Sequence, residues 1–220
     1  MSWTWLTPFG NALWLLPLAI LVAAFAMWHE RMRHWREVLP WLGALLFASA
    51  LVAASKIAFY GWGVGVYSLN LTAPSGHAVL AMAFWPVFLM LLAPTRRVTL
   101  RTLLAFLGVA LGLAVGVSRT VLGAHPPSEV LAGVMIGGVV AAIGVGHMRR
   151  LGMGVAPVVL LLAALVALPS WKPDWIYQHL PSERWFARIA TELSGRDKPY
   201  NRTGWLREGR AAAAKAQPRP

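Results

Sequence analysis

The 220-residue chain contains no cysteine and is poor in charge for its length. The missing cysteines exclude disulfide bonds, iron–sulfur clusters and thiolate zinc sites. Only 13% of the residues are charged and 58% are hydrophobic, whereas about a quarter of a soluble domain is charged. This much apolar surface cannot be hidden in a soluble core of this size. We therefore expect a polytopic membrane protein.

Acidic residues are scarce as well, because 8 Asp and Glu stand against 20 Lys and Arg, for a net charge of +12. In a soluble protein this excess would indicate nucleic-acid binding. Here the cations fall in short loops between apolar runs and in the C-terminal tail, without a basic face that carries polar side chains for reading bases. They are explained by membrane topology and by contacts to anionic headgroups, so we expect a membrane partner and no nucleic acid.

Six apolar runs have about the length needed to cross a membrane as tilted helices, and the third is the shortest. We predict an all-α fold in which six transmembrane helices form one bundle over residues 1–170. An amphipathic tail over 171–208 and a disordered end over 209–220 are expected to follow. The predicted spans are 9–28, 38–60, 76–93, 99–118, 128–147 and 153–170.

The distribution of arginine predicts how the bundle sits in the membrane. The first, third and fifth loops carry eight arginines, whereas the second and fourth loops and their helix ends carry only Lys56 and Arg119. The positive-inside rule places the arginine-rich loops in the cytoplasm. We therefore expect a bacterial inner-membrane protein whose second and fourth loops, and the tail, face the periplasm.

The tail itself contains one amphipathic pattern. Ser182 is a candidate cap for a short helix whose apolar side holds Trp185, Phe186, Ile189 and Leu193. This pattern fits either a helix that lies in the membrane interface or one that packs on the loops.

The second loop ends in Pro74-Ser75-Gly76-His77, directly before an apolar run. Ser and Gly at a helix start leave free backbone N–H groups, which form an anion site together with the helix dipole. Gly76 allows a tetrahedral oxyanion to approach the backbone closely. We expect His77, on the first turn, to reach the leaving oxygen of a bound phosphate.

A second cluster follows the fourth span and consists of Ser118-Arg119, five residues, His125, three residues and Glu129. The guanidinium of Arg119 can bind two phosphate oxygens at once. His125 and Glu129 are four residues apart, so a helix that begins nearby would turn both in one direction. A carboxylate on one imidazole nitrogen fixes the tautomer and leaves the other nitrogen free for nucleophilic attack.

Together these motifs resemble the phosphatidic acid phosphatase type 2 superfamily, whose pattern is K-x6-R-P, then P-S-G-H, then S-R-x5-H-x3-D. The resemblance covers roughly residues 50–150. It implies a lipid phosphatase without metal or other cofactor, in which His125 is the nucleophile and His77 protonates the leaving group. Glu129 replaces the family's Asp and would orient His125. The implied phosphate ligands are Lys56, Ser75, Gly76, Ser118 and Arg119.

The first motif of the family is incomplete in this chain. Lys56 is the candidate for its lysine, but Gly63 and Val64 stand where the family has Arg-Pro. The phosphate site therefore lacks one arginine, and we hypothesise that the tail folds back on the same face and supplies it. The candidates are Arg184, Arg188, Arg196 and Arg202.

The expected substrate is a lipid phosphate or diphosphate, with an undecaprenyl-type diphosphate favoured because an outward-facing bacterial site would meet it there. Phosphatidate, phosphatidylglycerophosphate and lipid A phosphate stay open, since apolar grooves discriminate weakly between chain types. Two other functions also stay open. The phosphohistidine could transfer its phosphate to a second lipid, or the chain could be a non-catalytic relative that binds or translocates lipid phosphates. The sequence does not predict the number of subunits.

Overall fold

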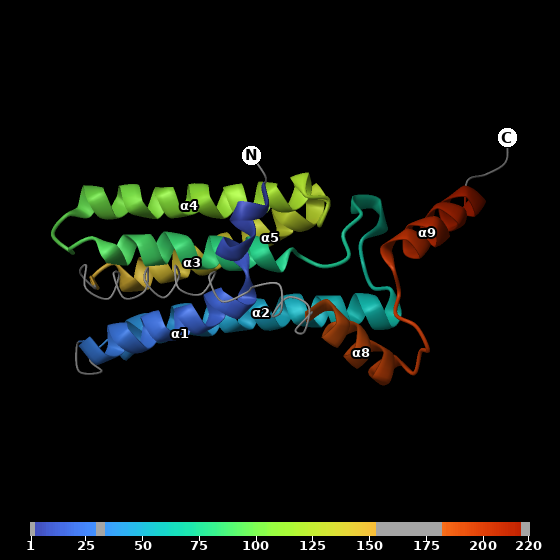
Figure 1. Cartoon of the computed structure of the whole chain (residues 1–220), viewed down its shortest axis with the longest axis horizontal. Helices are drawn as coiled ribbons and strands as arrows, with labels where there is room; N and C mark the ends of the chain where they lie inside the picture. The colour runs from blue at the N-terminus through green and yellow to red at the C-terminus, as the bar shows by residue number, and fades with distance from the viewer. Residues whose placement is uncertain (1–2, 30–33, 153–181, 217–220) are drawn as a thin grey trace.

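The computed structural model describes residues 3–29, 34–152 and 182–216, and these residues form helices and loops with one isolated bridge between Val66 and Leu71 (Figure 1). The fold is therefore all-α, as predicted. Its α-helices and two 3-10 helices (η) are η1 (Trp3–Gly10), α1 (Ala12–His29), α2 (Trp35–Trp62), η2 (Tyr67–Leu69), α3 (Gly76–Leu92), α4 (Val98–Val121), α5 (Pro127–Met148), α8 (Ser182–Ser194) and α9 (Arg202–Ala216).

The predicted spans agree with the helices to different degrees. Helices α2, α4 and α5 are each long and apolar enough to cross a membrane, and η1 with α1 forms a further candidate span that is bent by 45°. Helix α3 is equally apolar but has only 17 residues. The structure thus supports three or four membrane spans, and the predicted span over 153–170 lies outside the described residues.

Helix α3 forms the core of the bundle, because α1, α2, α4 and α5 all pack around it. Helices α4 and α5 approach it through glycine faces. A Cβ atom at Gly108 would lie 2.5 Å from the backbone of Pro86, and one at Gly137 would lie 2.5 Å from the carbonyl oxygen of Val79. Close backbone approach at small residues is the usual way in which membrane helices gain packing contacts.

Arg101, one of the arginines that we assigned to the cytoplasmic loops, has a structural role that the sequence does not reveal. Arg101 is only 5% exposed, and its guanidinium donates to the carbonyl oxygens of Ala93 at 2.8 Å and Met148 at 3.3 Å. These carbonyls follow α3 and end α5, where a helix leaves acceptors without intrahelical partners. Arg101 therefore ties three helices together at one end of the bundle.

The tail lies at the opposite end. Helix α8 packs on the C-terminal part of α2, where a Cβ atom at Gly61 would meet the carbonyl oxygen of Ala190 at 3.1 Å (Figure 1). The apolar side predicted for this helix is divided. Phe186 lines a cavity, whereas Trp185 and Leu193 are 61% and 65% exposed, and Ile189 is exposed as well. The apolar side as a whole is therefore not packed on the loops.

Helix α9 continues to Ala216. Its alanine-rich second half has a high helix propensity. The expected disordered end over 209–220 stays a prediction.

Candidate active site

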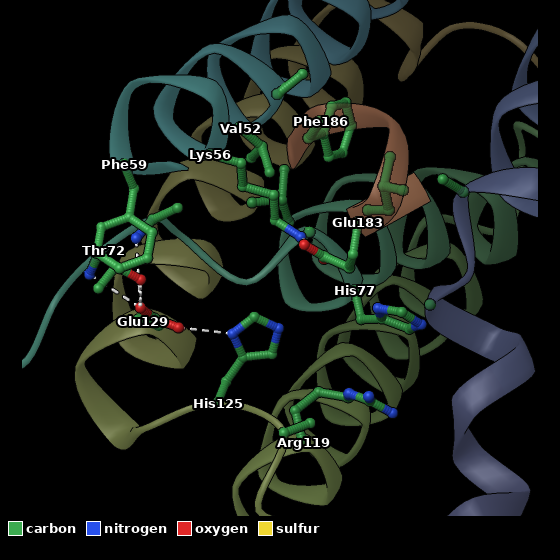
Figure 2. A pocket seen from close by; sticks show the side chains of 18 of the residues that line it. Val52, Lys56, Phe59, Thr72, His77, Arg119, His125, Glu129, Glu183 and Phe186 are labelled. Carbon is green, nitrogen blue, oxygen red and sulfur yellow. Dashed lines mark hydrogen bonds and ion pairs between the residues drawn. The ribbon is translucent and has the colours of Figure 1, made fainter. Parts of the chain in front are cut away.

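A cavity of about 1020 Å³ lies where the ends of α2, α3 and α4 meet the tail (Figure 2). Side chains from α2, the start of α3, the end of α4, the start of α5 and the tail all face it. The structure thus brings together motifs that are far apart in the sequence. Six of the eight predicted site residues line this cavity: Lys56, Gly76, His77, Arg119, His125 and Glu129.

His125 and Glu129 form the closest pair among them. Helix α4 ends at Val121, and Gly123, at a φ of 68°, reverses the chain so that the His125 N–H donates to the carbonyl oxygen of Arg119. His125 precedes α5 and Glu129 lies on its first turn, with Nδ1 of His125 2.7 Å from Oε2 of Glu129. An ionised carboxylate can only accept, so Nδ1 carries a proton, and in the neutral imidazole Nε2 then holds the lone pair, on the side of the ring that faces the cavity (Figure 2).

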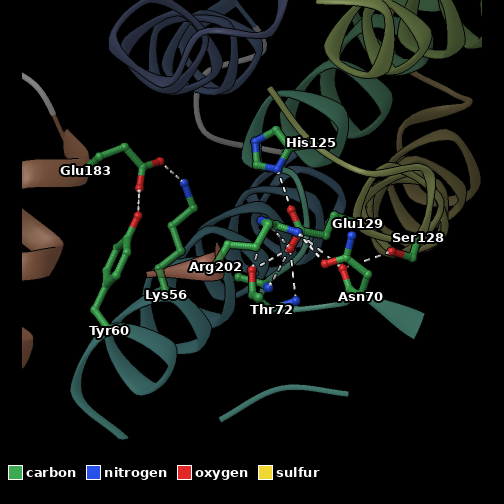
Figure 3. A network of polar contacts seen from close by, with 10 residues as sticks. Lys56, Tyr60, Asn70, Thr72, His125, Ser128, Glu129, Glu183 and Arg202 are labelled. Carbon is green, nitrogen blue, oxygen red and sulfur yellow. Dashed lines mark hydrogen bonds and ion pairs between the residues drawn. The ribbon is translucent and has the colours of Figure 1, made fainter. Parts of the chain in front are cut away.

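Glu129 is 1% exposed, and its second oxygen, Oε1, is fully engaged. It accepts from the Thr72 N–H at 2.9 Å, the Thr72 hydroxyl at 2.5 Å and the Ala73 N–H at 3.3 Å. A guanidinium N–H of Arg202 from the tail donates to the same oxygen at 2.7 Å (Figure 3). A buried carboxylate is tolerated when its acceptors are satisfied in this way.

Lys56 reaches the cavity from α2, but it already has a partner. Its ammonium forms an ion pair with Glu183 of α8, whose other oxygen accepts from the Tyr60 hydroxyl at 2.6 Å (Figure 3). Burial alone would raise the pKa of Glu183, but the Lys56 charge and the Tyr60 hydroxyl together lower this pKa below its ordinary value. Glu183 therefore carries a full negative charge next to Lys56 at neutral pH.

Arg119 and His77 line the cavity, and each has a polar atom that the rest of the site does not satisfy. Arg119 donates through Nη1 to the Thr7 hydroxyl at 3.1 Å. Its Nε and the Nε2 of His77 are buried and have no hydrogen-bond partner among the described residues. Leaving such a buried group unpaired costs about 1–3 kcal/mol.

Two predicted phosphate ligands do not face the cavity. The Ser75 N–H donates to the backbone carbonyl of Glu129 at 2.9 Å, and its side chain is buried. Ser118 is buried as well, and its hydroxyl donates to the carbonyl oxygen of Val115 at 2.6 Å. The Ser75 N–H thus links the start of α3 to α5, whereas the Ser118 bond stays within α4, and the structure does not bring either hydroxyl to the cavity.

Several residues of the site were not predicted. Thr72 lies two positions before the P-S-G-H motif, so that proximity was the one available signal. Of the four candidate tail arginines, only Arg202 lines the cavity.

No group of three or more His, Asp or Glu side chains in the described part of the chain is arranged to hold a metal ion. The residues that the sequence gave no reason to select are Thr7, Tyr60, Asn70, Glu183 and Phe186.

Comparison with known proteins supplies independent similarities. Residues 60–152 match the PAP2 superfamily. The chain is 36% identical over 214 residues to an uncharacterized 22.5 kDa protein in the cps region of Klebsiella pneumoniae, which covers 92% of this chain and 97% of that protein.

Two curated relatives carry the name of an activity. The chain is 30% identical over 158 residues to the lipid A 1-phosphatase of Rhizobium etli, covering 60% of this chain and 64% of the relative. It is 30% identical over 157 residues to the lipid A 1-phosphatase of Rhizobium johnstonii, and the match covers 60% of this chain and 61% of that relative. The chain thus spans less than two thirds of either lipid A 1-phosphatase, and no solved structure matches it.

Proposed function

The chain belongs to the PAP2 superfamily, and from this premise we propose that it is a membrane lipid phosphatase that uses His125 as its nucleophile. The observation that carries the proposal is the pair formed by His125 and Glu129, 2.7 Å apart. A binding protein needs no imidazole whose tautomer is fixed by a buried carboxylate. The pair faces a cavity that also contains the cations Lys56 and Arg119.

In the proposed reaction, Nε2 of His125 attacks phosphorus, and the new P–N bond forms as the P–O bond to the lipid breaks. His77 gives a proton to the leaving lipid oxygen, a step that requires His77 to be protonated in the complex with the negatively charged substrate. Water then attacks the phosphorus of the phosphohistidine and passes a proton to His77. The P–N bond breaks in this step, so that Nε2 of His125 is free again and inorganic phosphate is released. Lys56 and Arg119 stabilise the equatorial oxygens, which is the main demand in phosphoryl transfer.

The substrate in this proposal is a lipid phosphate presented at the periplasmic face of the inner membrane. The two Rhizobium relatives support a lipid A-type monophosphate, and neither is named for an undecaprenyl-type diphosphate. The charge of Glu183 next to Lys56 also leaves less positive potential for a second phosphate group. We therefore place a monophosphate ahead of a diphosphate.

The first test measures release of inorganic phosphate by the purified full-length protein in detergent with EDTA present. Lipid A, undecaprenyl diphosphate and phosphatidate are offered to the parent and to His125→Ala. We expect metal-free release that falls by about 10³-fold or more without the nucleophile. His147→Ala is the matched control, because His147 is exposed and bonds only to the carbonyl oxygen of Ile143 in its own helix.

The outcomes separate the alternatives. Label that moves to a second lipid without free phosphate would identify a phosphotransferase. Binding without turnover in the folded parent, unchanged in His125→Ala, would identify a non-catalytic relative and would contradict the proposal.

A further inference from the structure

The tail contributes one arginine that the three-part motif pattern does not contain. We propose that this residue, Arg202, is a positioning residue that holds Glu129 in the orientation needed by His125. The inference rests on the proposed function, since it concerns the same site. Arg202 opens α9, 73 positions after Glu129, and its Nη2 lies 2.7 Å from Oε1 of that carboxylate (Figure 3).

The contacts of the guanidinium show what it binds. Nη1 donates to the backbone and side-chain oxygens of Asn70, at 3.2 and 3.1 Å. Nη2 donates to the Thr72 hydroxyl at 3.1 Å as well as to Glu129. Both terminal nitrogens are therefore directed at the loop before α3 and at the carboxylate. Arg202 acts as a clamp on these groups, whereas Arg119 keeps a buried nitrogen without a partner among the described residues.

The incomplete first motif explains how the tail reaches this place. Gly63, which stands where the family has arginine, has a φ of 69°, and a Cβ atom there would lie 3.1 Å from the ring of Tyr200. The Tyr200 N–H also donates to the carbonyl oxygen of Tyr60 at 2.9 Å. Trp205 packs edge-on against Phe59, with ring centroids 5.8 Å apart. The tail thus occupies the space next to Gly63 and delivers Arg202 two residues later.

The geometry of Glu129 gives the clamp its purpose. Glutamate has one more rotatable bond than the aspartate of the family pattern, so its carboxylate needs more restraint to keep Oε2 on His125. Arg202 supplies one donor, Nη2, and a countercharge to this carboxylate, which is 1% exposed, while its Nη1 anchors the guanidinium on Asn70. A displacement of about 1 Å in a catalytic group can cost about 10²-fold in rate. Loss of the clamp should therefore act on the chemical step.

The test uses the full-length protein and compares Arg202→Gln with Arg202→Lys and with Arg207→Gln. Arg207 is an exposed arginine on the same helix, so its variant matches the change in charge. We expect Arg202→Gln to lower kcat by about 10- to 100-fold, with KM and inhibition by inorganic phosphate changed by less than about threefold. Arg202→Lys keeps the charge but not the planar guanidinium, so its kcat should lie between those of the parent and Arg202→Gln. Arg207→Gln should have the kcat of the parent.

A double-mutant cycle shows whether Arg202 acts through Glu129. In the Glu129→Gln background, adding Arg202→Gln should lower kcat by less than about threefold, because the group on which Arg202 acts is already altered. Independent, multiplicative losses would overturn the inference. So would a raised KM and weaker phosphate inhibition at unchanged kcat, which would make Arg202 a phosphate ligand, or an Arg202→Gln enzyme that equals Arg207→Gln. A folded parent that hydrolyses no lipid phosphate would instead overturn the proposed function, and this inference with it.

Discussion

Glu183 places a negative charge where an anionic substrate needs a positive one. The side chain is ionised at neutral pH, because its contacts to Lys56 and Tyr60 outweigh the burial that would raise its pKa. A phosphate that approaches Lys56 must therefore compete with this carboxylate. The side chain of Glu183 is 51% exposed and that of Lys56 13%, so water reaches the pair mainly from the carboxylate side.

Glu183→Gln should strengthen substrate binding. Removing the competing charge leaves Lys56 free for phosphate, so we expect KM for a lipid monophosphate, and the inhibition constant of inorganic phosphate, to fall several-fold at similar kcat. Steady-state kinetics in detergent check this. Glu192→Gln, an exposed position on the same helix, controls for the change in net charge. A rise in KM would show that Glu183 helps to bind the substrate.

The residues of the site were predictable only where a short motif contains them. His77, Arg119, His125 and Glu129 lie in motifs whose internal spacing places them on adjacent helix ends, and all four line the cavity. Glu183 was not predictable, because it is 127 positions from Lys56 and no periodicity links a tail residue to a distant helix. Gly63 and Val64 stand where the family has Arg-Pro, which indicated that an arginine was missing. Arg202 was one of the four tail residues considered as its replacement.

At the scale of the elements, glycine faces set how closely the helices approach α3. A Cβ atom at Gly137 would lie 2.5 Å from the carbonyl oxygen of Val79 and 2.8 Å from the Cβ of Met82. The first of these is a backbone atom in the buried helix and cannot move without shifting α3. The next residue, Gly138, has open space around its position. The two glycines therefore offer a matched pair on one helix.

Gly137→Ala should destabilise the bundle, while Gly138→Ala should not. An inserted methyl group in a close-packed core typically costs about 1–3 kcal/mol. At Gly138 the same change has room and lowers the conformational entropy of the unfolded chain, so stability should stay equal or rise slightly. Denaturant midpoints in a fixed detergent, followed by circular dichroism, check both. Equal midpoints for the two variants would contradict the close approach of α5 to α3.

Five of the six predicted spans coincide with described helices to within about three residues at each end, because long apolar runs between charged loops leave few other folds in a membrane, while the sixth lies outside the described residues. The predicted span 128–147 differs from α5 by one residue at each end. The burial of Arg101 was not predicted. A loop arginine counted for topology looks the same in sequence as one that binds the carbonyl oxygen of Met148 across the bundle.

At the scale of the whole molecule, the described chain has two distinct ends. Arg101 binds the carbonyl oxygens of Ala93, directly after α3, and of Met148, the last residue of α5, at one end. Lys56, at the C-terminal part of α2, meets α8 at the other end. The loop before α3 lies at the second end, and the tail contacts it through Arg202 and Asn70 (Figure 1). The loop and the tail must therefore be on the same side of the membrane, and the positive-inside rule predicts the periplasmic side.

Single cysteines can test this orientation directly, because the chain contains no other thiol. Ser68, Thr95 and Thr203 are exposed positions in the loop before α3, the loop before α4 and the tail. In intact spheroplasts, a membrane-impermeant maleimide should label Ser68→Cys and Thr203→Cys, and should label Thr95→Cys only after permeabilisation. The reverse pattern would overturn the periplasmic site. Labelling of Ser68→Cys and Thr203→Cys from opposite sides would contradict the docking of the tail, and with it the delivery of Arg202 to Glu129.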